Sequence, residues 1–213
     1  MPIQRDEPTP VKTGRSWSAP PFQHLIAIGT STGGPRALHA VLTALPADLP
    51  APVLVVQHMP PKFTKSLAER LNASSAITVV EGADGMIVEK GTAYIAPGGY
   101  HMMMVRDEAG VYRIKLTLDD PVSGHRPSVN VLFQSLLPFQ ELKKYVVLMT
   151  GMGSDGAKGM QALALAGSVA TIAESEETCV VYGMPRAAVQ LECVTHILPL
   201  HEIPGKLSVM IQG

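Results

Sequence analysis

Cysteine, long apolar runs and net charge are all scarce in this sequence. Its two cysteines, Cys179 and Cys193, stand in apolar surroundings without C-x-x-C spacing, which favours free buried thiols in a reducing cytosol. No apolar run approaches the roughly 18 residues that span a bilayer, and the N-terminus lacks the apolar stretch of a signal peptide. We therefore expect a cytoplasmic protein that is not embedded in a membrane.

The formal net charge of -1 gives no indication of a nucleic-acid partner. With 46% hydrophobic and 16% charged residues, the composition is typical of a globular protein with a core. Residues 1–22 differ from the rest because they are rich in proline, mixed in charge and without periodicity, which indicates an interdomain linker or a disordered tail. One domain is expected over residues 23–213.

From His24 onward, short apolar runs alternate with segments of helical spacing. Strands are predicted at 25–28, 53–57, 77–80, 92–96, 145–149, 169–172 and 195–198. Helices are predicted between Ser31 and Pro46, at 63–71, at 129–136, from Met160 to Gly167, at 185–191 and from His201 onward. Residues 101–105 and 112–116 flank a turn and predict a hairpin. This order predicts an α/β fold with a doubly wound, mostly parallel sheet, helices on both faces and an inserted antiparallel hairpin.

The segment Gly29-Thr30-Ser31-Thr32-Gly33 has the spacing G-x-S-x-G between a predicted strand and a predicted helix. This pattern can hold a serine on a sharp turn with its hydroxyl exposed at the end of a sheet. Pro35 suits the first turn of the helix, where its missing N–H is not needed. The alternative is a glycine-rich turn that binds phosphate at a helix N-terminus.

Three residues of complementary chemistry follow three predicted strands: Ser31, His58 and Asp155. Active sites of parallel sheets lie beyond the carboxyl ends of the strands, so these residues can meet if the strands are parallel. A serine needs a base to take its proton, and the histidine needs an acceptor on its other nitrogen. The N–H of Met152 and a turn N–H near Ser31 and Thr32 are candidate donors to an oxyanion.

Other interpretations remain open from the residues alone. His101 and His125 also lie near loops and compete for the role of base, and Asp155 could be a helix N-cap. The residues Gly151-Met-Gly153-Ser-Asp-Gly156 match G-x-G-x-x-G, with Glu174 about 20 residues later, as in dinucleotide-binding folds. A phosphopeptide or scaffold module that uses the glycine loops as anion sites is a third class. Cys179 is a weaker candidate nucleophile, since no histidine lies near it in the strand pattern.

Six motifs resemble one known family, in that family's order, from about His24 to the C-terminus. They are Ile28-Gly-Thr-Ser-Thr-Gly-Gly34, Gln57-His-Met-Pro-Pro61, Tyr94-Ile-Ala-Pro-Gly98, His125-Arg-Pro-Ser-Val129, Thr150-Gly-Met-Gly-Ser-Asp-Gly156 and Tyr182-Gly-Met-Pro-Arg186. They resemble the catalytic domain of CheB-type chemoreceptor protein-glutamate methylesterases. The resemblance implies a serine hydrolase that removes methyl groups from glutamyl methyl esters on the cytoplasmic helices of chemotaxis receptors, and that deamidates certain glutamines.

The same resemblance implies Ser31 as nucleophile, His58 as base and Asp155 as the orienting acid, with Met152 as oxyanion donor and Thr32 close by. It implies no metal and no cofactor. Because receptor methylation regions are typically acidic, the cations Arg36, Lys62, Arg126 and Arg186 are expected to line a substrate rim. The family usually carries a receiver domain upstream, where this chain has only residues 1–22. We therefore expect a catalytic fragment or a stand-alone form.

Overall fold

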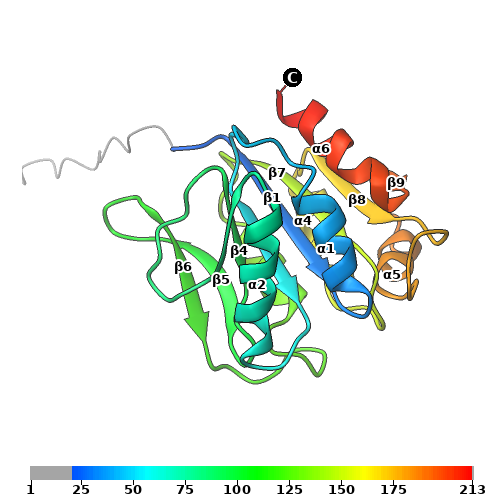
Figure 1. Cartoon of the computed structure of the whole chain (residues 1–213), viewed down its shortest axis with the longest axis horizontal. Coiled ribbons are helices and arrows are strands. Elements are labelled where there is room, and N and C mark those ends of the chain that lie inside the picture. The colour runs from blue at the N-terminus through cyan, green and yellow to red at the C-terminus, as the bar shows by residue number, and fades with distance from the viewer. Residues whose placement is uncertain (1–20, 213) are drawn as a thin grey trace, which may run out of the picture.

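Seven parallel strands form the central sheet of the computed structural model, which describes residues 21–212 (Figure 1). Their order across the sheet is β3-β4-β2-β1-β7-β8-β9. The strands are β1 His24–Thr30, β2 Val53–Gln57, β3 Thr78–Glu81, β4 Thr92–Ile95, β7 Lys143–Leu148, β8 Ala170–Glu174 and β9 His196–Leu198. The predicted fold class is confirmed, and the ends of the predicted strands shift by one or two residues.

The middle strands are apolar along nearly their whole length because both of their faces are covered. Every residue of β2 is buried, and so is every residue of β1 after His24. Because helices pack on both faces of a parallel sheet, the sequences of such strands are continuously apolar and do not alternate between apolar and polar residues. The register pairs Thr30 with Gln57 on one side of β1 and Gly29 with Leu148 on the other, so three chain segments leave the sheet side by side.

Two hydrophobic cores lie on the two faces of the sheet. The first is built from α1 Gly34–Leu42, α2 Phe63–Ser74 and α6 Ile203–Gln212, the last preceded by a 3-10 turn at Leu200–Glu202. The second contains α3 Val129–Ser135, α4 Ala157–Leu165, α5 Met184–Gln190 and the hairpin of β5 His101–Arg106 and β6 Tyr112–Thr117. In Figure 1, α1 and α2 lie in front of the sheet and the hairpin extends to the left.

The helix predicted up to Pro46 ends earlier, at Leu42. The Thr43 hydroxyl donates to the His39 carbonyl at 2.7 Å, and the chain then leaves the helix while Leu45 stays in the core. The apolar spacing therefore predicted burial correctly but overstated the length of the helix. At the other end, Phe22 is buried and packs on Tyr112 with ring centroids 5.1 Å apart, so the core extends one residue beyond the predicted boundary. The rest of the predicted linker, residues 1–20, lies outside the described part of the chain.

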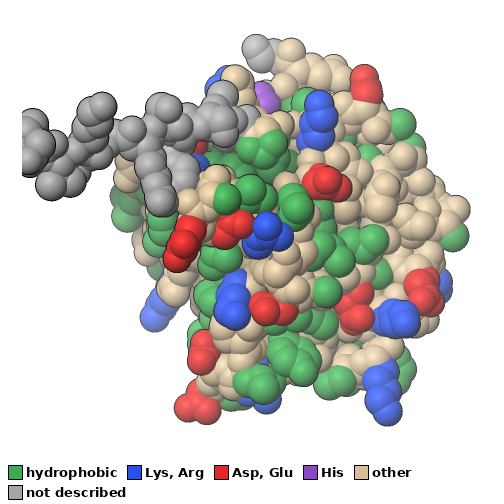
Figure 2. Space-filling view, turned by 90° about the vertical axis from the view of Figure 1, so that its left-hand side faces the viewer, with side chains coloured by type: hydrophobic (Ala, Val, Ile, Leu, Met, Phe, Trp, Pro, Cys, Tyr) green, Lys and Arg blue, Asp and Glu red, His purple; other side chains and the backbone are tan. Residues whose placement is uncertain are grey.

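The hairpin side of the molecule carries charges of both signs. Arg113 pairs with Asp107 at 2.7 Å, and Lys115 approaches Asp84 at 3.5 Å. Figure 2 shows Lys, Arg, Asp and Glu side chains interspersed on this side, with hydrophobic side chains between them. Within residues 21–212, no helix has both the length and the apolar character needed to cross a membrane.

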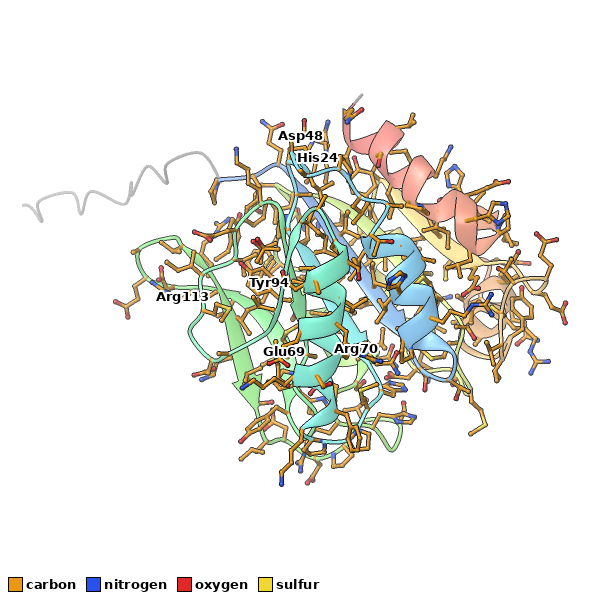
Figure 3. All side chains as sticks on the ribbon, viewed as in Figure 1. His24, Asp48, Glu69, Arg70, Tyr94 and Arg113 are labelled. Carbon is orange, nitrogen blue, oxygen red and sulfur yellow. The ribbon has the colours of Figure 1, made fainter. Side chains whose placement is uncertain are left out.

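The edge of the sheet where the strands begin is closed by polar contacts. The Tyr145 hydroxyl donates to the Met210 carbonyl at 2.9 Å and lies 3.0 Å from Nδ1 of His24, which ties β7 to α6. Figure 3 shows His24 and the exposed Asp48 at this edge, far from the carboxyl ends of the strands.

Candidate active site

The structure brings Ser31 and His58 together just beyond the ends of β1 and β2. The backbone N–H of His58 donates to the Thr30 carbonyl at 3.1 Å, which continues the ladder between these strands. The N–H of Ser31 donates to the Thr150 carbonyl at 3.0 Å on the opposite side of β1. Neighbouring strands of a parallel sheet thus place the serine, the histidine and the loop before α4 next to one another.

His58 is bonded to Asp155. The imidazole Nε2 lies 2.8 Å from Oδ2 of the carboxylate, and the two side chains are only 6% and 1% exposed. A carboxylate accepts hydrogen bonds, so Nε2 carries the proton and Nδ1 has a free lone pair. Nδ1 is buried and has no hydrogen-bond partner among the described residues. The structure therefore holds a histidine oriented by an acid, with one unused basic nitrogen.

Asp155 is fixed by the start of α3. Its Oδ1 accepts from the Ser128 hydroxyl at 2.9 Å and from the Asn130 N–H at 3.1 Å, and its Oδ2 accepts from the Val129 N–H at 2.7 Å. Burial by itself would raise the pKa of Asp155, but the bonds from His58 and from these three donors outweigh it and hold the pKa below its ordinary value. The carboxylate is thus ionised and rigidly placed.

Ser128 is a site residue that the sequence analysis did not single out. It is the N-cap of α3, where its side chain accepts from the Val131 N–H, and it also donates to Asp155. The local signal was present, since a serine directly before an apolar helical run is a typical N-cap. Its link to Asp155 has no local signal because the two residues are far apart in the sequence.

Ser31 sits on a turn with a fixed backbone and an unbonded hydroxyl. Its carbonyl accepts from the Gly34 N–H at 2.8 Å and from Nε2 of Gln57 at 2.9 Å. Gly33 caps α1 with φ of 85°, a conformation that favours glycine. The Ser31 hydroxyl makes no hydrogen bond within the described structure, and Ser31 lines the same pocket as His58. Hydrogen bonds between a nucleophile and its base are often formed only when substrate binds.

The loop after β7 packs directly against Ser31. A Cβ atom placed on Gly151 would lie 2.8 Å from Cβ of Ser31, so only glycine allows this approach. The Gly151 carbonyl accepts from the N–H groups of Gly183 and Met184 at 3.1 and 2.9 Å. Met152, the next residue, is 71% exposed, and no acceptor among the described residues takes its N–H. Its N–H therefore remains available to a bound group, as an oxyanion donor requires.

Hydrogen bonds of Thr150 and Glu174 fix the position of that loop. The Thr150 hydroxyl accepts from the N–H groups of Val180 and Val181, each at 3.0 Å, and lies 2.9 Å from the Thr32 carbonyl. Glu174 is fully buried and accepts from the Thr150 N–H at 2.8 Å and from the Thr178 hydroxyl at 3.0 Å. The loop is therefore preorganised by contacts from β8 and from the segment before α5.

The same contacts argue against dinucleotide binding. Glu174, the acid that the G-x-G-x-x-G interpretation would place on a ribose, lies inside the protein with its oxygens engaged. Asp155, within the glycine motif, points to His58 and α3. Neither carboxylate is available to a cofactor.

The competing histidines and Cys179 have other surroundings. His101 is buried, accepts from the Ser128 N–H at 3.2 Å and lies 3.1 Å from the Asp120 carbonyl, so both of its ring nitrogens have structural contacts. His125 stacks on His58, with ring centroids 3.7 Å apart and an angle of 9° between the planes. Burial, together with the nearby Glu174, raises the pKa of Cys179 to about 12, which keeps the thiol protonated.

A pocket of about 380 Å³ opens beside Ser31 and His58. It is lined by Ser31, His58, Met59, Pro60, Gly124, His125, Arg126 and Pro127. Within the described residues, no group of three or more His, Cys, Asp or Glu is placed to hold a metal ion.

The four predicted rim cations have different positions. Arg126 lines the catalytic pocket, and its guanidinium donates to the carbonyls of Leu118 and Asp119. Lys62 is the exposed N-cap of α2, two residues after Pro60 in the pocket wall. Arg186 is exposed in the first turn of α5, which begins beside Gly151. Arg36 lines a second pocket of about 550 Å³ between α1 and α2, together with Arg70, which Figure 3 labels on α2.

Comparison with known proteins identifies the family. Residues 26–207 match the family model described as CheB methylesterase. A protein-glutamate methylesterase/protein-glutamine glutaminase of Geobacillus kaustophilus is 53% identical over 91% of this chain and 55% of its own length. The protein of the same name from Bacillus subtilis is 46% identical over 89% of the chain and 53% of its own length. The chain thus spans about half the length of the curated relatives it matches.

A solved structure matches over almost its whole length. The crystal structure of the Thermotoga maritima CheB methylesterase catalytic domain superposes with a TM-score of 0.84 and 41% sequence identity. The alignment covers 88% of this chain and 98% of that one. On the family match, the relatives and the shared fold, this chain belongs to the CheB methylesterase family.

Proposed function

We propose that this chain is the catalytic unit of a protein-glutamate methylesterase and protein-glutamine glutaminase. Its substrates are glutamyl methyl esters, and certain glutamines, on the cytoplasmic helices of chemotaxis receptors. The observation that carries the proposal is the 2.8 Å bond between His58 and Asp155 beside Ser31, in a chain that matches enzymes of that name. Receptor helices of this kind lie on the cytoplasmic side of the membrane, so the enzyme works in the cytoplasm.

The first half of the reaction acylates Ser31. Nδ1 of His58 takes the proton from the Ser31 hydroxyl as the oxygen attacks the ester carbonyl, and Asp155 stabilises the imidazolium that forms. The Met152 N–H donates to the negative carbonyl oxygen, with a turn N–H at Thr32 as a second donor. The tetrahedral intermediate collapses when the C–O bond to the methoxy group breaks, and His58 returns its proton to the leaving oxygen. The products are methanol and a glutamyl ester of Ser31.

The second half regenerates the enzyme. His58 takes a proton from water, the hydroxide oxygen attacks the acyl carbonyl, and the bond to the Ser31 oxygen breaks with return of the proton to Ser31. The receptor is left with a free glutamate. Glutamine follows the same path, with ammonia leaving in place of methanol. A protein helix must reach the serine, and Ser31 lines the pocket of about 380 Å³ together with His58 and Arg126.

The test is methanol release from methylated receptor membranes. The variant Ser31→Ala should lose several orders of magnitude in turnover, because nothing else at the site can be acylated. Ser66→Ala is the matched control: Ser66 is exposed on α2 and should be replaceable without effect. Methanol release by Ser31→Ala at the parent rate would refute the proposed nucleophile. A Ser31-dependent enzyme that hydrolyses small esters but releases no methanol from receptors would refute the proposed substrate.

A further inference from the structure

His125 covers one face of the catalytic imidazole. The two rings are almost parallel, with an interplanar angle of 9° and 3.7 Å between centroids. His58 is held at its edge by Asp155, but a hydrogen bond at one nitrogen leaves the ring free to tilt about that bond. The stacked ring of His125 removes this freedom, and it also lines the pocket that contains Ser31.

The loop that carries His125 is built to hold this position. The backbone groups of Val122 and His125 exchange two hydrogen bonds, at 3.1 and 3.0 Å, around a tight turn. Ser123 and Gly124 have φ of 54° and 78° in this turn. The Arg126 carbonyl accepts from the Gly99 N–H at 3.1 Å. Two residues later, Ser128 is bonded to Asp155, so one loop holds both the orienting acid and the ring that covers the base.

The charge on His125 matters because His58 becomes cationic during the reaction. Burial lowers the pKa of His125, the neighbouring His58 lowers it further, and Asp155 acts in the opposite direction. Besides His58 and Asp155, the loop itself carries the charged Arg126. Its guanidinium donates to the carbonyls of Leu118 and Asp119. A neutral His125 can stay in contact with an imidazolium, whereas a protonated one would repel it.

We propose that His125 is a positioning residue of this hydrolase: as a neutral ring stacked on His58, it holds the base in line between Asp155 and Ser31. The role rests on the proposed serine-hydrolase function. It requires an aromatic ring without charge at position 125 and does not require a hydrogen bond from that ring to substrate.

Three substitutions separate the parts of this role. His125→Phe keeps a flat ring and removes the proton, His125→Ala removes the ring, and His125→Lys adds a fixed charge. His39→Ala is the control, since His39 is an exposed histidine on α1 that lines the second pocket. Each variant is assayed for methanol release from methylated receptor membranes and for the rate at which a fluorophosphonate ester labels Ser31. The labelling reports on the base without any receptor.

His125→Ala should lower kcat about 10- to 100-fold with little change in KM, because a tilted base misses the serine proton. His125→Lys should lower it at least as much, and His125→Phe should stay within about threefold of the parent at neutral pH, by the same positional argument. The labelling rates should follow the same order. Below the lowered pKa of His125, the parent should lose activity more steeply with falling pH than His125→Phe, because the ring at position 125 can be protonated only in the parent.

Labelling and methanol release that are equal in all four proteins would overturn the role of His125. A rise in KM with unchanged kcat and unchanged labelling would also overturn it, since His125 would then contact the receptor. If Ser31 is labelled in the expected order but no protein releases methanol from receptors, the proposed substrate fails while the role of His125 stands.

Discussion

The carboxylate of Asp155 has four hydrogen-bond donors around it: His58, Ser128, Val129 and Asn130. Both oxygens are therefore needed as acceptors. An amide has only one acceptor, so its nitrogen would face either the backbone N–H of Asn130 or that of Val129 together with His58. In the second orientation, the amide would donate to His58 and force the proton onto Nδ1, where the lone pair is needed.

We predict that Asp155→Asn lowers turnover roughly 10³- to 10⁴-fold, as expected when the histidine is held in the wrong tautomer. The unpaired donors should also reduce the free energy of unfolding by about 1–3 kcal/mol. Methanol release and urea unfolding measure the two effects, and Asp48→Asn at the opposite edge of the sheet is the control. A variant with normal turnover would exclude Asp155 as the orienting acid.

The stability difference between the parent and Asp155→Asn should depend on pH. The pKa of Asp155 is lowered by folding, so the ionised carboxylate stabilises the native state above the unfolded pKa of about 3.9. This contribution disappears as pH falls through the lower folded value. Urea unfolding at pH 7 and at pH 3 to 4 should therefore show a smaller difference in acid, and a constant difference would contradict the assigned contacts.

At the scale of single residues, the sequence predicted what lies next to a strand and missed what depends on loop packing. Ser31, His58 and Asp155 each follow a strand signal closely, and the carboxyl-edge rule relates them. His101 begins β5 and His125 lies in a loop, and only the folded chain distinguishes the buried histidine from the one stacked on His58. The positions of such side chains are set by contacts between distant segments, which no local pattern encodes.

Among the elements, the end of β7 connects several parts of the site. Thr150 follows this strand. Its hydroxyl accepts from the N–H groups of Val180 and Val181 and donates to the Thr32 carbonyl. Its carbonyl accepts from the Ser31 N–H. It thereby ties the nucleophile turn, the Met152 loop and the segment before α5 into one unit. Loss of the Thr150 hydroxyl should therefore loosen the loop that carries Met152, the proposed oxyanion donor, while the backbone bond from Ser31 to the Thr150 carbonyl is kept.

We predict that Thr150→Val, which keeps the shape and removes the hydroxyl, leaves two N–H groups without a partner and reduces the free energy of unfolding by about 1–3 kcal/mol. Its kcat should fall about tenfold or more, with a smaller change in KM, because a displaced N–H donor stabilises the oxyanion less well. Thr43→Val is the control, since its hydroxyl bonds only the exposed end of α1. Equal losses in both variants would indicate a general effect on folding.

Element type could be predicted well, and element order could not. Burial on both faces gives strands such as β2 an unmistakable apolar run, and the glycine and proline signals mark where α1 begins. The position of β4 between β2 and β3 has no such signal, because strand order depends on how whole helices pack across the sheet. The early end of α1 was missed for a related reason: Leu45 keeps helical spacing but reaches the core from a loop.

At the scale of the whole molecule, we expect attraction of a partner to come from a few charged side chains near the pocket and not from the net charge. The net charge is only -1, and charges of both signs intermingle on the hairpin side, so no overall field guides a partner. Near the catalytic pocket, the exposed Lys62 and Arg186 stand at the starts of α2 and α5. On the function proposed above, we infer that these two cations attract an acidic receptor helix.

We predict that the double variant Lys62→Glu and Arg186→Glu lowers kcat/KM for methylated receptors several-fold at low salt and flattens its salt dependence, because steering by surface charge is screened by ions. The rate of Ser31 labelling by the neutral fluorophosphonate should not change. Lys143→Glu, at the opposite edge of the sheet, is the control. An unchanged salt dependence would argue against a cationic rim.

The strand β1 separates the two partners of the proton relay, since His58 follows β2 on one side and Asp155 follows β7 on the other. A polypeptide nicked in the turn between β5 and β6 would divide into one piece with the nucleophile and base and another with the orienting acid. Neither piece would possess a complete relay, so full esterase activity would return only on reassembly along β1. Recovered turnover from two such fragments would therefore report that they have met.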